Sequence, residues 1–290
     1  EIKHDIEQFG MVGLLEQGEA FTSALRTDTV NLLSEVFRSE ASIMHEFGTG
    51  FTVFFEWRHR RVGGRGEWNF LNPETGLPIE RLITTEATGA LRFAKGERFV
   101  GGEFVRRSLG TEWPVLDATV TWAMPNVLGS QYNYTRCTLE AFDEVRLGWW
   151  GRMEWLATAG KYFGTAPFPL MEVVPASGTF FMTEEAFNML RLFEQVTDEW
   201  VSANVEWHGE GILFNHLPLL RRLELREVIG VKGIAGNWDS RHEALLELPE
   251  ETTGLNGVYS ECSVGLENIF GVLRVDGVWR TDLPLADPAS

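Results

Sequence analysis

Apolar and polar residues alternate with a period of two along most of the chain after Ala41. Segment 199–209 has apolar side chains at every second position, namely Val201, Ala203, Val205 and Trp207. This period places apolar side chains on one face of a β-strand and polar side chains on the other. About twelve segments with this or a related pattern predict strands at 11–17, 43–48, 51–62, 84–94, 114–124, 134–146, 152–159, 187–196, 199–209, 219–236, 258–266 and 273–280.

The predicted strands are joined by short turns and by long loops rich in Gly, Pro and Asn. The long loops lie at 63–80, 101–113, 164–185 and 236–257. Short turns at one end of a sheet and long loops at the other are typical of an up-and-down outer-membrane β-barrel. A soluble antiparallel barrel or sandwich gives the same alternation, because it buries one face of each strand and leaves the other in water.

Two features favour the membrane barrel. The polar face of the predicted strands is dense in charges of both signs, as expected of a lumen, and segment 221–236 exceeds the usual strand length of about 5–6 residues. Trp and Tyr also gather near strand ends, for example at Trp113, Trp149 and Trp200. Such a distribution is typical of aromatic girdles at the two membrane interfaces.

Composition narrows the function classes. With 290 residues, 44% of them hydrophobic, the chain can bury a sizeable core. Its net charge of −17 repels a phosphate backbone, so nucleic acid is not expected as a partner, and the same argument disfavours anionic membrane surfaces. No run of about 18 uncharged apolar residues predicts a membrane helix, but the strands of a barrel need only about 9–11 residues each.

Several separated stretches resemble one family of proteins. They read FNML at 187–190, DEWV at 198–201, HGEGILFNHLPLL at 208–220 and LELREV at 223–228, followed by GLENIF at 265–270 and LRVD at 273–276. They resemble a family of Bacteroidota outer-membrane proteins with an N-terminal carboxypeptidase-regulatory-like domain and a C-terminal barrel of unassigned function. The closing segment is also similar, more distantly, to the last two strands of surface-antigen barrels of the BamA/TamA type.

This resemblance covers about residues 80–281 and implies the C-terminal barrel of a longer precursor. Surface-antigen barrels close with sixteen strands, whereas about twelve are predicted here. The chain is therefore either a shorter complete barrel or a part of a larger one. Many such barrels also end on an aromatic residue, whereas Trp279 is followed by a polar tail.

The sequence thus predicts an all-β fold, an antiparallel up-and-down transmembrane β-barrel. Residues 1–40 form an N-terminal segment or the first barrel strands, and within them 27–37 fits a capped helix or a strand equally well. Residues 41–283 form the barrel, and 284–290 form a polar tail.

No catalytic, cofactor-binding or metal-ligating residues are predicted. The chain lacks a metalloprotease helix, a phosphate loop and a dinucleotide fingerprint, and its six histidines lack the spacing of metal ligands. Ser202 and His208 share one strand face, but roughly 20 Å along a strand is too far for a nucleophile and its base. We therefore expect a protein that is not an enzyme and has no cofactor.

A network of charges in the lumen is the sharpest site hypothesis. Arg222, Glu224 and Arg226 alternate after loop 209–220 and are expected to face Glu206 and His208 across a hairpin. Arg226 and Asp276 also resemble, in type, an arginine and an acidic strand residue that meet in surface-antigen barrels. The candidate set is therefore Glu206, His208, Arg222, Glu224, Arg226 and Asp276, and the alternative is an ordinary polar wall that fills the lumen.

Loop 161–185 is long and apolar, so it needs burial inside the barrel or against a partner. Together these patterns predict a non-enzymatic protein of the bacterial outer membrane. Its expected partners are outer-membrane lipid and other outer-membrane or periplasmic proteins of an assembly, secretion or surface complex. Two alternatives remain: a barrel for protein insertion or translocation of the surface-antigen type, and a soluble β-barrel binding module.

Overall fold

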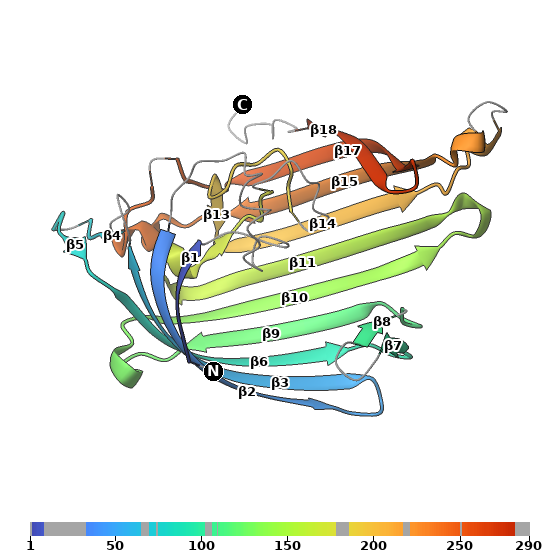
Figure 1. Ribbon diagram of the computed structural model, residues 1–290. Coiled ribbons are helices and arrows are strands. Elements are labelled where there is room, and N and C mark those ends of the chain that lie inside the picture. Colours follow the sequence, from blue (N-terminus) through green and yellow to red (C-terminus); the bar gives the residue numbers. More distant parts are fainter. Residues whose placement is uncertain are drawn as a thin grey trace, which may run out of the picture.

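The computed structural model describes residues 2–8, 33–64, 70–73, 75–101, 106–108, 110–177, 186–216, 221–249 and 251–281. Within these ranges the fold is all-β, with one large antiparallel sheet and short 3-10 turns (Figure 1). In sheet order its eleven described strands are β1 (Ile2–Gln8), β2 (Leu33–Glu46), β3 (Phe51–Gly64), β6 (Leu82–Phe93), β9 (Val115–Ala123), β10 (Asn133–Arg146), β11 (Arg152–Thr165), β14 (Glu199–His208), β15 (Arg226–Asn237), β17 (Gly257–Ile269) and β18 (Leu273–Arg280). The described residues contain no helix that is long and apolar enough to cross a membrane.

Each strand pairs with its neighbours in sequence, so the sheet is an up-and-down meander. Among the described residues no ladder joins β1 to β18, and the two strands form the edges of a curved sheet. The all-β, antiparallel part of the predicted fold is confirmed. A closed barrel is not found in the described residues.

The connections differ between the two ends of the sheet. One end, which we call the turn end, carries the short turns 47–50, 147–151 and 270–272, together with the longer connections 94–114 and 209–225. Connection 94–114 includes the small hairpin β7 (Phe99–Gly101) and β8 (Arg106–Ser108). The other end, the loop end, carries connections 65–81, 124–132, 166–198 and 238–256. The predicted separation is therefore met only in part: the predicted long loop 101–113 belongs to connection 94–114 at the turn end, and connection 209–225 also lies there.

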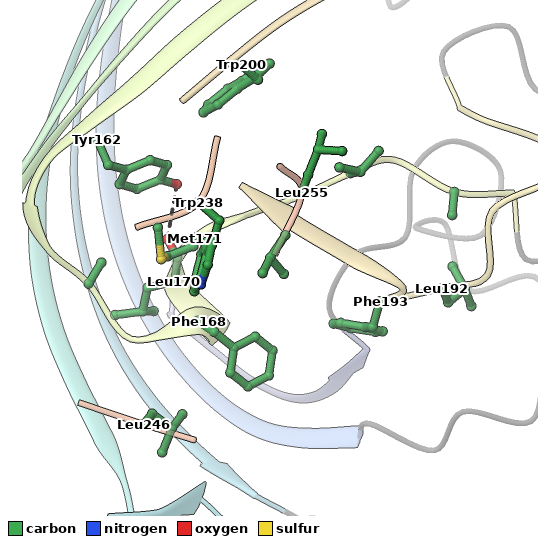
Figure 2. Packing of buried hydrophobic residues seen from close by; sticks show 14 of the residues in the cluster. Tyr162, Phe168, Leu170, Met171, Leu192, Phe193, Trp200, Trp238, Leu246 and Leu255 are labelled. Carbon is green, nitrogen blue, oxygen red and sulfur yellow. Dashed lines mark hydrogen bonds between the residues drawn. The ribbon is translucent and has the colours of Figure 1, made fainter. Parts of the chain in front are cut away.

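The concave side of the sheet holds a hydrophobic core at the loop end (Figure 2). Nine strands each contribute one side chain to it, namely Val36, Val62, Leu82, Ala123, Tyr134, Tyr162, Trp200, Ile234 and Tyr259. The loops that cross this end fill the middle with Phe168, Leu170, Met171, Val174, Phe187, Leu190, Leu192, Phe193, Trp238, Leu246 and Leu255. Burial of each large side chain contributes about 1.5–3 kcal/mol, so the loops hold the curved sheet together at this end.

These loops also form a small sheet inside the large one. It consists of β12 (Glu172–Val173), β13 (Gln195–Thr197) and β16 (Thr253–Gly254). The sequence predicts burial of loop 161–185 inside the barrel or against a partner. Residues 166–171, 174 and 176 are buried on the concave side of the chain's own sheet, 161–165 belong to β11, and 178–185 lie outside the described residues.

Two further strand predictions concern segment 187–196 and the N-terminal region. Segment 187–196 is not a strand: it consists mainly of turns whose side chains Phe187, Leu190 and Phe193 pack into the core, and only its end joins β13. An apolar run without polar alternation fits a buried loop as well as a strand. In the N-terminal region, 2–8 and 33–40 form strands of the large sheet, whereas the predicted strand at 11–17 and the tail at 284–290 lie outside the described residues.

Candidate functional site

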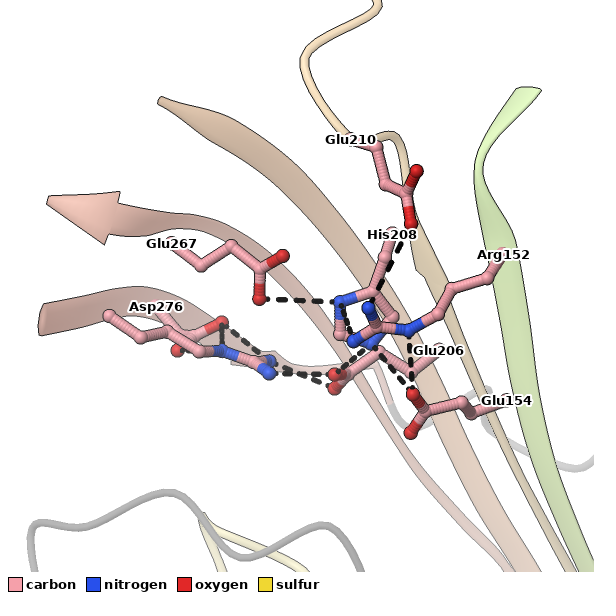
Figure 3. A network of polar contacts seen from close by, with 8 residues as sticks. Arg152, Glu154, Glu206, His208, Glu210, Glu267 and Asp276 are labelled. Atoms are coloured by element: carbon pink, nitrogen blue, oxygen red, sulfur yellow. Dashed lines mark hydrogen bonds and ion pairs between the residues drawn. The ribbon is translucent and has the colours of Figure 1, made fainter. Parts of the chain in front are cut away.

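The inward face of the sheet is polar along the middle of each strand and towards the turn end. In β14, Trp200, Ser202, Asn204, Glu206 and His208 point inward and are less exposed than the residues between them. Near the turn end these strands hold a set of linked charges that we call the Glu206 network (Figure 3). Its members are Arg152, Glu154, Glu206, His208, Glu267, Arg274 and Asp276.

Arg274 lies at the centre of this network. Its Nη1 and Nη2 donate to the two carboxylate oxygens of Glu206 at 2.7 and 2.9 Å, a bidentate geometry. Its Nε donates to Asp276 Oδ2 at 2.8 Å. Charge-assisted, bidentate pairs of this kind are among the strong hydrogen bonds in proteins, and here one guanidinium is shared between two largely buried carboxylates.

His208 links Glu206 of its own strand to Glu267 of β17. Its Nε2 lies 3.0 Å from Glu206 Oε1, and its Nδ1 lies 3.3 Å from Glu267 Oε2. Arg152, on the neighbouring strand, pairs with Glu154 at 2.9 Å. The network therefore connects β11, β14, β17 and β18, and it fixes four strands relative to one another near the turn end.

Two glycines make room for these long side chains. A Cβ at Gly265 would lie 2.1 Å from Asp276 Oδ1, and one at Gly230 would lie 2.4 Å from Ser263 Oγ. Gly230 is also the register partner of Glu206. Because β15 and β17 present no side chain at these two positions, Arg274 of β18 can reach Glu206 of β14 across them.

A second group of inward charges holds the interior loop. The carboxylate of Glu261 accepts the backbone N–H groups of Asn188 and Met189 at 2.9 and 2.8 Å, and the hydroxyl of Tyr259 at 2.6 Å. The register partner of Glu261 on β15, Lys232, donates to Ala186 O at 2.9 Å. This pair thus binds the backbone of 186–189 to the sheet, which is a structural use of buried charge.

A third group lies on β3, β6, β10 and β12. Arg60 pairs with Glu86 at 2.7 Å, and Glu86 also accepts a short hydrogen bond from the hydroxyl of Tyr134. Arg136 pairs with Glu172 of β12 at 3.1 Å. Burial raises the pKa of Glu172 more than the neighbouring Arg136 lowers it.

A cavity of about 850 Å³ lies between the interior loops and the sheet. Strands β9 to β15 line it with polar residues that include Glu140, Thr158, Ser202 and Lys232. Ser202 Oγ is hydrogen-bonded to Thr158 Oγ1 at 2.7 Å rather than to a histidine. Within the described part of the chain, no group of three or more His, Cys, Asp and Glu side chains is placed to hold a metal ion.

Three of the six predicted network residues do meet: Glu206, His208 and Asp276. The other three do not face them. Arg222 is in the 3-10 turn η6 (Arg221–Leu223), Glu224 follows it, and Arg226 is the exposed first residue of β15. The residues that lie opposite Glu206 and His208 on β15 are Gly230 and Val228.

Sequence reasoning missed the centre of the network, Arg274, although a signal was present. Arg274 lies between the apolar residues Leu273 and Val275, and Asp276 follows Val275, so both occupy polar positions of segment 273–280. That alternation places them on the inward face, but it does not say which distant strand they reach.

The outward face of the sheet has the opposite character. Its exposed side chains are mostly apolar, among them Val53, Phe55, Leu91, Leu116, Val120, Trp122, Leu139, Val201, Val205, Val231, Val264 and Val275. Both cysteines of the chain, Cys137 and Cys262, are free and occupy outward positions between such residues. The sheet therefore has apolar side chains outside and ion pairs inside.

Comparison with protein families gives a match. Residues 65–242, more than half of the chain, match the C-terminal domain of a family of unknown function, DUF5686. The chain belongs to this family. No curated protein matches it. The family is a C-terminal domain of unknown function. This agrees with the resemblance seen in the sequence in one respect, namely that the resembling region is a C-terminal domain of unassigned function.

Proposed function

We propose that this member of the DUF5686 family forms the membrane-spanning wall of a bacterial outer-membrane β-barrel. It acts without enzymatic activity, as a subunit of, or an accessory to, an assembly, secretion or surface complex. Its immediate partner is outer-membrane lipid, and its further partners are outer-membrane or periplasmic proteins.

The observation that carries this proposal is the inverted polarity of the sheet. Apolar side chains such as Leu139, Val201 and Val231 are more than half exposed on the outward face, whereas Glu206 and His208 are buried on the inward face. Apolar surface in water is unfavourable by about 25 cal/mol per Å², so a face of this size requires a cover. The hydrocarbon of a bilayer covers such a face and keeps its apolar side chains out of water. The strands of membrane barrels alternate in the same way, with apolar side chains facing lipid and polar side chains facing inward.

The dimensions of the apolar band agree with a bilayer. On β11 the outward side chains from Met153 to Ala159 are apolar, and the ion pair of Lys161 with Glu199 at 2.7 Å ends the band at the loop end. The exposed Trp150 lies beyond the band at the turn end. The distance from Arg152, the first residue of β11, to Lys161 is about 30 Å along the strand. It corresponds to about 21–23 Å across the membrane at a tilt of about 40–45°, close to the apolar band of about 25 Å that is typical of such barrels.

The interior supports a structural rather than a catalytic role. The inward charges described above are used in ion pairs or in hydrogen bonds to loop backbone. The loops crossing the loop end pack into a core that fills this part of the interior. Such an interior is suited to a rigid wall that presents loops to partner proteins.

Gel mobility tests the membrane assignment. We expect the chain to require detergent for extraction from membranes and to migrate differently on a gel before and after heating, because a folded barrel resists unfolding by cold detergent. Recovery from plain buffer as a monodisperse monomer would overturn the proposal and favour the soluble binding module.

Purification from native membranes tests the accessory role. The tagged full-length protein is extracted in mild detergent, and the proteins that accompany it are identified against a control barrel of similar abundance. Enrichment of secretion or assembly components is expected. Recovery of the protein alone, at full yield, would contradict the accessory role while leaving the membrane assignment intact.

A further inference from the structure

Several of the most exposed apolar side chains lie in connections at the turn end. Phe270 is 87% exposed, Val272 is 84% exposed and Trp149 is 74% exposed. With Trp150, Leu213 and Leu223 they come from three turns, and we call these six residues the turn-end rim. Large apolar residues at turn tips are unusual, because turns favour Gly, Asn, Asp, Ser and Pro.

The backbone conformation of turn 270–272 is unfavourable for the phenylalanine that the turn carries. Phe270 has a φ of 53°, in the left-handed region that favours glycine or asparagine. An aromatic residue there costs conformational energy and gains little burial against the residues that the structure describes. Its side chain is therefore available for a surface outside the molecule.

The three turns form one continuous rim. The indole Nε1 of Trp207 donates to Trp150 O at 2.8 Å, which joins turn 147–151 to the end of β14. Asn268 Nδ2 donates to Glu224 O at 2.8 Å, which joins turn 270–272 to connection 209–225. These contacts link the three connections to one another along this end of the sheet.

Basic residues accompany the rim, although the chain as a whole carries a net charge of −17. Arg221 and Arg222 are adjacent and exposed in η6, directly before Leu223. The side chain of Arg146, before Trp149, is also exposed. Aromatic and aliphatic side chains beside arginines are typical of surfaces that insert at the level of phospholipid headgroups.

The rim also continues the outward apolar face. Val272 is followed by Leu273 and Val275, which are exposed on the outward face of β18. A surface that covers the outward face of β18 can therefore extend to Val272 of the rim without meeting a polar side chain on this strand.

We propose that the turn-end rim lies in the headgroup layer of an anionic phospholipid leaflet, with Arg221 and Arg222 against the phosphates. This rests on the proposed membrane-spanning role of the sheet, and it places the turn end on the phospholipid side of the membrane. The loop end then faces the opposite side.

Depth-dependent fluorescence quenching tests this placement. The full chain, with Cys137→Ser and Cys262→Ser, receives one new cysteine by Val272→Cys, Leu139→Cys or Leu77→Cys and is labelled with a polarity-sensitive dye. Position 139 is in the middle of the outward face, and position 77 is a similarly exposed leucine in a connection at the loop end. Each labelled protein is placed in lipid nanodiscs of phosphatidylcholine and phosphatidylglycerol.

We expect the label at position 272 to be quenched by lipids that carry a quencher near the headgroup and to be protected from aqueous iodide. The label at 139 should respond to a quencher deep in the acyl chains, and the label at 77 should respond to iodide. If 272 is as accessible to iodide as 77 while 139 is quenched by lipid, the rim proposal is wrong and the membrane-spanning sheet stands. If 139 also shows no lipid quenching, the proposed function itself fails.

The arginines are tested separately. In the labelled protein that keeps Arg221 and Arg222, the label at 272 should be quenched more by brominated phosphatidylglycerol than by brominated phosphatidylcholine at equal fractions. Arg221→Gln with Arg222→Gln should lower that preference by up to about fivefold for each arginine. Arg191→Gln, at an exposed site in a loop-end connection, is the matched control and should leave it unchanged. An unchanged preference in the double variant would overturn the phosphate contact, and protection of 272 that requires an added protein would identify the rim as a protein-binding surface instead.

Discussion

The replacement Arg274→Met tests whether the Glu206 network holds the sheet together. It removes the guanidinium that is ion-paired with both Glu206 and Asp276, and it keeps the length of the apolar stem. The five nitrogen–oxygen contacts that are lost span 2.7–3.1 Å, and the two carboxylates that remain have only 10% and 7% of their side chains exposed.

The magnitude follows from this burial. Removing one partner of a buried ion pair costs about 3–5 kcal/mol, because the other charge stays buried without compensation. Arg274 is itself partly exposed, and His208 remains beside Glu206, so we expect the lower end of this range. A loss of about 3 kcal/mol lowers the folding equilibrium constant by roughly 150-fold.

The free energy of unfolding is measured by urea titration in detergent or lipid, with the fluorescence of the 11 tryptophans as the signal. Arg146→Met is the control. Its side chain is 87% exposed and has a single contact at 3.7 Å to Glu144, so the expected loss is below about 1 kcal/mol.

A triple variant separates the loss of charge balance from the loss of packing. Adding Glu206→Gln and Asp276→Asn to Arg274→Met removes both uncompensated charges, so most of the lost stability should return. The reasoning is refuted if Arg274→Met costs no more than Arg146→Met, or if the triple variant is as unstable as the single one.

Three further predictions follow from the interior. Glu261→Ala should speed amide hydrogen exchange in 186–197, because the side chain accepts two backbone N–H groups there, whereas Glu199→Ala in an exposed ion pair should not. Burial raises the pKa of Glu172, so ionising this carboxyl group lowers the stability of the fold as the pH rises past the normal carboxylate range. Glu172→Gln should therefore have a higher free energy of unfolding than wild type at pH 7, and this difference should disappear towards pH 4. A Cβ at Gly160 would lie 2.2 Å from the Trp200 ring, so Gly160→Ala should lower the free energy of unfolding by about 1–3 kcal/mol, whereas Gly89→Ala, with nothing within 4 Å, should change it little.

Periodicity predicted most of the sheet because its two faces differ so strongly. Strands β9, β14 and β18 follow the expected segments closely, since each alternates between an apolar outward face and a polar inward one. The same rule failed at 187–196, where both faces are buried and no alternation exists to show the backbone conformation.

The site was harder to predict because it depends on register and on distant strands. Connection 209–225 takes up Arg222 and Glu224, so β15 starts at Arg226 and brings glycine rather than arginine opposite Glu206. The arginine that does reach Glu206 comes from β18, with β15 and β17 between them. Alternation gives the face of a side chain, whereas its partner depends on where neighbouring glycines leave space.

The order of the sheet has a consequence for how its edges can meet. Along the eleven described strands every neighbouring pair is antiparallel, so β1 and β18 run in the same direction. Joining these two edges directly would give a parallel pair. A cylinder made only of antiparallel pairs therefore needs an odd number of strands beyond those described, and each such strand would replace an open edge with hydrogen bonds that a bilayer cannot supply.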